Sequence, residues 1–90
     1  MKKHYKLTIK GRVQGVWYRA STKQKAIELG LMGFVQNEHD GSVYAEIEGE
    51  AAAVRDMIAW CKQGPELAQV ERVEVEEGRI LNFESFEIRR

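Results

Sequence analysis

The chain has 90 residues, of which 43% are hydrophobic and 31% charged, and its 14 basic and 14 acidic side chains give a formal net charge of zero. This length fits one compact domain over residues 1–90, and the composition excludes a second domain, a disordered chain and a membrane-spanning segment. The isoelectric point of about 6.7 argues against a nucleic-acid partner, because such proteins usually carry an overall basic excess.

The charges are distributed unevenly along the chain. The first 27 residues carry eight Lys or Arg and no acid, whereas the other 63 carry six basic and fourteen acidic side chains. A one-sided positive field attracts small anions, so we expect a small anionic partner. The start of the chain lacks the apolar stretch of a signal peptide, and the single cysteine, Cys61, excludes an intrachain disulfide. We therefore expect a cytoplasmic protein.

In the first third of the chain, a strand pattern gives way to a helical one. Tyr5, Leu7 and Ile9 alternate with polar residues, which is typical of a strand with one buried face. The stretch that follows has no regular period and indicates a loop. From Tyr18 the apolar spacing is helical, and Gly30 stands where a helix often ends in a left-handed residue, which predicts a helix over about 19–29.

The rest of the chain repeats this alternation of elements. The patterns predict strands over about 32–37 and 43–47 joined by a turn at Asp40-Gly41, a helix over about 50–63, a strand around Val73 and Val75, and a short edge strand around Phe86 and Ile88. The order of strand, helix, strand, strand, helix, strand favours a ferredoxin-like α+β fold. In this split βαβ sandwich, two helices cover one face of an antiparallel sheet. The fold carries many functions and does not by itself indicate the chemistry.

The loop over residues 11–19 is the part of the sequence that points to chemistry. A loop with glycines at both ends of its turn, leading from a strand into a helix, aims backbone N–H groups at one point, where the helix dipole also favours an anion. Gly15 lets the chain bend sharply, and Arg19 enters from the first helical turn with a guanidinium that suits two phosphate oxygens. A cation at this end of a helix is repelled unless an anion is bound.

Other phosphate sites are excluded by spacing and by residue type. The Walker pattern requires four residues between its glycines and a following Lys-Ser/Thr, but only three residues separate Gly11 from Gly15. Residues 11–19 contain no Cys, Ser, Thr, Asp or His that could form a phosphoenzyme. The only histidines, His4 and His39, are expected on the surface without a role, and no cluster has metal-ligand spacing. We therefore expect neither a metal nor a cofactor.

The segment GRVQGVWYR at 11–19 resembles the signature of the acylphosphatase family, Gly-x-Val-Gln-Gly-Val-x-Phe/Tyr-Arg, at every fixed position. GFVQN at 33–37 and DGSV at 40–43 resemble the family's second block, with Phe34 in place of the usual Trp. Later strings, including residues 70–73 and 86–89, are also similar, so the resemblance covers nearly the whole chain.

The resemblance implies an enzyme that hydrolyses the carboxyl–phosphate bond of a small acyl phosphate without a metal. We expect it to be a monomer that binds neither nucleic acid nor a membrane. The resemblance implies that Arg19 binds the phosphate and that Asn37 positions the attacking water. It also implies that backbone amides form the phosphate cradle, contributed by Gln14, Gly15, Val16, Trp17, Tyr18 and Arg19. Trp17 occupies the variable position of the signature.

Other interpretations remain open at this stage. Asn37 alone would fit a turn residue before Asp40-Gly41. The alternative function is a non-catalytic module that binds a small anion or metabolite, which would not require Arg19 and Asn37 together. An RNA-binding sheet would require an aromatic RNP-like string, which is absent, and an accessory domain of a larger enzyme would require further chain.

Overall fold

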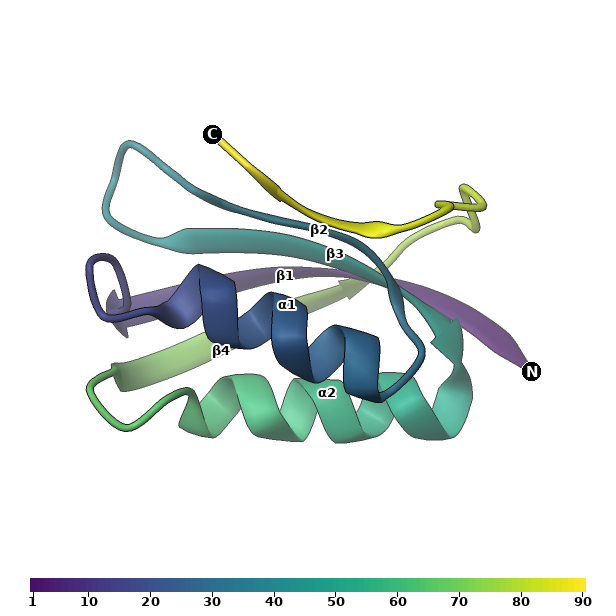
Figure 1. Ribbon diagram of the computed structural model, residues 1–90, viewed down its shortest axis with the longest axis horizontal. Helices are drawn as coiled ribbons and strands as arrows, with labels where there is room; N and C mark the ends of the chain where they lie inside the picture. Colours follow the sequence, from purple (N-terminus) through teal and green to yellow (C-terminus); the bar gives the residue numbers. More distant parts are fainter.

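The computed structural model describes residues 1–90 and contains five strands and two helices in the expected order. Figure 1 shows a sheet with both helices on one side, so that the protein has two layers. The elements are β1 (Lys2–Arg12), α1 (Tyr18–Glu28), β2 (Met32–Asn37), β3 (Val43–Glu50), α2 (Ala51–Gln63), β4 (Gln69–Glu77) and β5 (Phe86–Arg89).

The sheet has the strand order β4-β1-β3-β2-β5, with β1 and β3 at its centre. β1 pairs antiparallel with β3 and β4, and β2 pairs antiparallel with β3. Alternation explains why the central strands are buried: Leu7 and Ile9 on β1 and Val43, Ala45 and Ile47 on β3 face the helices and are fully buried. The expected α+β fold with two helices on one face is therefore confirmed.

β5 adds a parallel pair to this sheet. It lies at an edge of the sheet, as expected, and the edge is the one beside β2; its register with β2 is Gly33 to Phe86 through Gln36 to Arg89. The predicted antiparallel arrangement holds for the other four strands. Because β5 runs parallel to β2, its last residues leave the sheet at the same end as Asn37, which the antiparallel pattern would have placed differently.

The two helices bury one stripe each against the sheet. On α2 the stripe contains Val54, Met57 and Cys61, all at most 1% exposed, and the helix ends at Gly64, which has a φ of 71°. α1 begins and ends one residue earlier than its pattern indicated, and its first turn holds no acidic residue. The helices and the inner face of the sheet therefore enclose a single apolar core.

The other face of the sheet carries no helix, but part of it is covered by the segment 78–85. His4 lies under this segment and is only 1% exposed, so the expectation that it is a surface residue was wrong. Its ring nitrogens lie 2.9 Å from carboxylate oxygens of Glu48 and Glu46, and its ring stacks on that of Phe83 at 5.7 Å. His39, by contrast, is exposed as expected.

Candidate functional site

The loop between β1 and α1 has two residues in the left-handed conformation. Gly15 has a φ of 75°, and a Cβ added there would meet nothing within 4 Å, so the chain bends into open space at this point. Trp17, the residue before α1, has a φ of 67° and no side-chain cap hydrogen bond. An aromatic residue rarely adopts this conformation, which costs on the order of 1 kcal/mol or more. The loop therefore holds strain directly beside the start of the helix.

The backbone N–H groups of this loop have no acceptor within the protein. The first hydrogen bond of α1 runs from Ser21 N to Trp17 O at 3.0 Å, so the N–H groups of the preceding turn lack helical partners. The loop residues 14–17 also donate no backbone hydrogen bond to another part of the chain. Unpaired N–H groups at the positive end of a helix dipole make a favourable environment for an anion.

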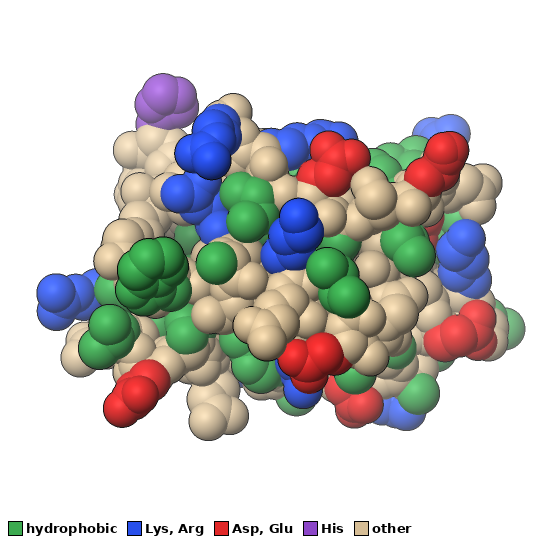
Figure 2. Space-filling view, in the orientation of Figure 1, with side chains coloured by type: hydrophobic (Ala, Val, Ile, Leu, Met, Phe, Trp, Pro, Cys, Tyr) green, Lys and Arg blue, Asp and Glu red, His purple; other side chains and the backbone are tan.

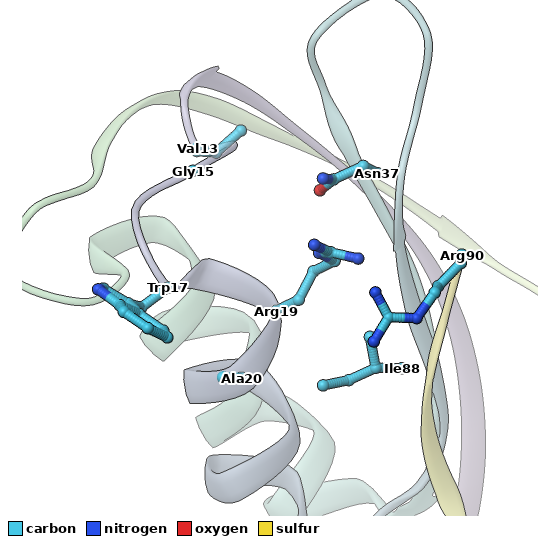
Figure 3. A pocket seen from close by; sticks show the side chains of 8 residues that line it. All are labelled: Val13, Gly15, Trp17, Arg19, Ala20, Asn37, Ile88 and Arg90. Atoms are coloured by element: carbon cyan, nitrogen blue, oxygen red, sulfur yellow. The ribbon is translucent and has the colours of Figure 1, made fainter.

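A cavity of about 320 Å³ opens beside these N–H groups. Figure 3 shows that Arg19, from the first turn of α1, and Asn37, from the end of β2, point towards one another across it, with the loop at Gly15 on a third side. The structure thus brings together two side chains that are 18 positions apart in the sequence. The residues that line the cavity are Val13, Gly15, Trp17, Arg19, Ala20, Asn37, Ile88 and Arg90.

The side-chain oxygen of Asn37 is a notable feature of this cavity. Oδ1 is buried and is the one buried side-chain polar atom in the chain that has no hydrogen-bond partner. Leaving a buried acceptor unpaired costs about 1–3 kcal/mol, so native proteins seldom keep one without a reason. An amide oxygen that faces a polar cavity is suited to accept a hydrogen bond from a water molecule.

The side chain of Gln14 connects the loop to the hairpin that follows Asn37, a role that the sequence reasoning missed. Its Nε2 donates hydrogen bonds to the carbonyl oxygens of Glu38 and Ser42, both at 2.8 Å. These carbonyls belong to the turn between β2 and β3. The side chain therefore fixes the position of Asn37 relative to the N–H groups of the loop.

Gln14, Val16 and Tyr18 are not among the residues that line the cavity, and the side chains of Val16 and Tyr18 are buried in the core. The Tyr18 hydroxyl donates to the carbonyl oxygen of Cys61 at 2.7 Å, which ties the start of α1 to α2. Burial raises the pKa of Tyr18 above its ordinary value, and burial also raises the pKa of the Cys61 thiol to about 12. Tyr18 therefore serves as an anchor that orients Arg19, and Cys61 stays a neutral thiol.

The cavity is positively charged and has no acidic side chain in its lining. Neither Arg19 nor Arg90 forms a salt bridge. Figure 2 shows basic side chains gathered on the helical face near the start of α1.

Sequence reasoning did not find Ile88 or Arg90 as part of the site, because their place depends on the pairing of β5 with β2. Alternation along β5 was the only signal that could have suggested it.

No three His, Cys, Asp or Glu side chains lie in an arrangement that would hold a metal ion. Neither of the two helices is both long and apolar enough to cross a membrane.

The fold and the cavity define a class: a small ferredoxin-like α+β domain with a positively charged pocket at the start of its first helix. Comparison with known proteins identifies the family. The acylphosphatase family model matches residues 5–88. An acylphosphatase from Nitrosococcus oceani is 53% identical over 81 residues, which cover 90% of this chain and 91% of that protein.

Solved structures agree with this assignment. The structure of an acylphosphatase from Coxiella burnetii has a TM-score of 0.95 and 34% identity, covering 98% of this chain and 93% of its own. That of an acylphosphatase from Bacillus subtilis has a TM-score of 0.95 and 31% identity, and the match covers 100% of both chains. The chain belongs to the acylphosphatase family, as the resemblance of residues 11–19 indicated.

Proposed function

We propose that the protein hydrolyses the carboxyl–phosphate bond of small acyl phosphates to a carboxylate and inorganic phosphate. The observation that carries this proposal is the meeting of three features in one cavity: unpaired backbone N–H groups, the guanidinium of Arg19 and the unpartnered oxygen of Asn37. The first two suit an anion of tetrahedral shape, and the third suits a water molecule. Membership of the acylphosphatase family supports the same reaction.

In this proposal the phosphoryl group lies against the loop. The N–H groups from Gln14 to Arg19 donate to its non-bridging oxygens, and the planar fork of Arg19 donates to two of them. These donors are held in place before the substrate arrives, so they stabilise the charge that builds on the oxygens in the transition state. Removal of one such donor typically lowers kcat about 10²–10³-fold.

The reaction needs little acid–base help. The leaving carboxylate has a conjugate acid with a pKa of about 4, so it departs without a proton from a catalytic acid. Asn37 cannot act as a base, but its oxygen can accept a hydrogen bond from the attacking water and hold that water in line with the bond that breaks. The proton released by the water passes to an oxygen of the phosphate itself.

The experiment follows the hydrolysis of benzoyl phosphate in EDTA with purified protein, without added metal. We expect the protein to hydrolyse benzoyl phosphate in EDTA as fast as it does without the chelator. In ¹⁸O-labelled water the label should enter phosphate and not benzoate, because water attacks phosphorus. Turnover equal to that of buffer would overturn the enzyme proposal and leave a module that only binds an anion. Label in benzoate would show attack at the carbonyl carbon instead.

We further propose that residues 1–90 act as one acylphosphatase-like domain, monomeric and cytoplasmic, with no nucleic-acid partner. The cytoplasmic location is supported by a fold that is held together without a disulfide, since Cys61 is free and buried. The exposed edge strand β4 carries Glu74, Glu76 and Glu77, whose charges discourage strand pairing between copies. Sedimentation at several protein concentrations tests the monomer: a mass that rises with concentration would contradict it.

A further inference from the structure

Arg90 places a second guanidinium in the cavity, beside that of Arg19, and has no role in the reaction proposed above. Alternation along β5 determines its direction: Phe86 is buried, Ile88 lines the cavity, and Arg90 follows on the same side. Figure 3 shows its side chain pointing into the cavity from the β5 side, towards Arg19.

The parallel register places Arg90 at the same end of the sheet as Asn37. The last pair in the ladder is Gln36 with Arg89, so the next residue of each strand, Asn37 and Arg90, leaves the sheet at the same end. The parallel pairing thus brings both residues to the cavity. In Figure 3 the guanidinium of Arg90 lies beside Ile88, on the other side of Arg19 from Asn37, so Arg90 and Arg19 face the same part of the cavity, where the phosphoryl group is proposed to bind.

The charges around Arg90 favour an anion. It forms no salt bridge, no acidic side chain lines the cavity, and Arg19 shares the same space. Two guanidinium groups that face one cavity repel each other, and a bound anion relieves that repulsion. We propose that Arg90 is a second anion-binding residue, which helps to hold the phosphoryl group of the substrate and the phosphate product. This inference rests on the proposed function, since it assigns a further residue to the same site.

Arg89 provides a matched control. It is the neighbouring residue on β5, it carries the same charge, and it faces the other side of the sheet, where its guanidinium lies 3.7 Å from the centre of the Phe34 ring. Arg89→Gln and Arg90→Gln therefore remove the same charge from adjacent positions, but only Arg90→Gln removes it from the cavity. Any effect of net charge on the attraction of anions should be nearly equal in the two variants.

The test measures binding of inorganic phosphate by calorimetry and the KM for acetyl phosphate and benzoyl phosphate. Because Arg90 is exposed at the mouth of the cavity, we expect Arg90→Gln to weaken phosphate binding about three- to tenfold. KM should rise by the same factor for both substrates with little change in kcat, and Arg90→Lys should recover part of the loss. Arg89→Gln should resemble the wild type.

Equal phosphate affinity in the wild type and Arg90→Gln would overturn the inference, as would equal losses in the two glutamine variants. A rise in KM for only one of the two substrates would assign Arg90 to the acyl group instead and would also overturn it. The proposed function fails in a different way: the wild-type protein itself would bind no phosphate or would hydrolyse neither substrate.

Discussion

The two faces of the sheet deal with charge in opposite ways. On the helix-covered side, Arg19 and Arg90 line a cavity without a carboxylate, and the nearby N–H groups and Asn37 Oδ1 lack partners. On the open side, the carboxylate of Glu48 is fully buried and accepts hydrogen bonds from the backbone N–H groups of Leu81, at 2.6 Å, and Phe83, at 2.9 Å. His4 lies against the same carboxylate.

This contrast separates function from stability. The unpaired groups are proposed to gain partners only when a ligand binds, so they do not stabilise the free protein, and their removal should damage chemistry without destabilising the fold. The paired groups of the open face hold the segment 78–85 against the sheet, and their removal should damage the fold alone. Mutations on each face test this separation.

Arg19→Gln should give the largest effect. We expect turnover of benzoyl phosphate to fall about 10³-fold or more, equivalent to about 4 kcal/mol, because this guanidinium is proposed to contact the phosphoryl oxygens. The free energy of unfolding in urea should stay the same or rise by a few tenths of a kcal/mol, since a cation is removed from the positive end of α1. A clear loss of stability would show that Arg19 also supports the fold.

Glu48→Gln should have the opposite effect. Glutamine keeps one acceptor oxygen, but its NH₂ group would face one of the donors that now bind the carboxylate. We therefore expect the free energy of unfolding in urea to fall by about 2–4 kcal/mol. The kcat of the folded variant at low temperature should match the wild type. Glu50→Gln is the control, because this exposed side chain pairs only with the N-terminal amine and should change stability by less than about 1 kcal/mol.

The pH dependence of the free energy of unfolding should also reveal the contribution of the Glu48 carboxyl. Burial alone would raise the pKa of Glu48, but the hydrogen bonds from Leu81 N–H, the His4 side chain and Phe83 N–H outweigh it and lower that pKa. A lowered pKa stabilises the fold above the ordinary value of about 4.3, and this stabilisation is lost as the pH falls through the folded value. The difference in the free energy of unfolding between the wild type and Glu48→Gln, measured in urea, should therefore narrow below about pH 4. A gap that stays constant down to pH 3 would contradict the role of this carboxylate.

Gln14→Ala should combine a moderate loss of stability with a loss of activity. Two hydrogen bonds to the turn after Asn37 disappear, which should cost about 1–2 kcal/mol in urea unfolding. Because Asn37 is then less well positioned, kcat should fall about tenfold with little change in KM. Gln36→Ala removes only a bond to the side chain of Glu38, so it should leave kcat unchanged. Equal kcat values in both variants would exclude Gln14 as a positioning residue.

Trp17 should give the smallest effect. Its φ of 67° suits glycine, so Trp17→Gly should be more stable in thermal unfolding than Trp17→Ala by about 1 kcal/mol. The two variants lose the same indole ring and differ only in how well they adopt this conformation. Equal melting temperatures would show that the loop relaxes when the ring is removed.

The elements could be predicted from local patterns, and the two facing side chains, Arg19 and Asn37, could be predicted from the resemblance of residues 11–19 and 33–37 to the motifs of the family. Period-two and helical spacing specify strands and helices, and the motif at 11–19 determines Arg19. The misjudged or missed residues depend on contacts between distant segments. His4 sits on the polar side of its strand, and only the irregular segment 78–85 buries it. Arg90 reaches the cavity only because β5 runs parallel to β2.

The measurement that tests the central claim most directly compares phosphate binding with turnover in Arg19→Ala and Asn37→Ala. Arg19 is proposed to bind the phosphoryl group and Asn37 to hold the water, so Arg19→Ala should lose both phosphate binding and hydrolysis. Asn37→Ala should lose hydrolysis but bind inorganic phosphate as the wild type does. Equal phosphate affinity in the two variants would contradict the account.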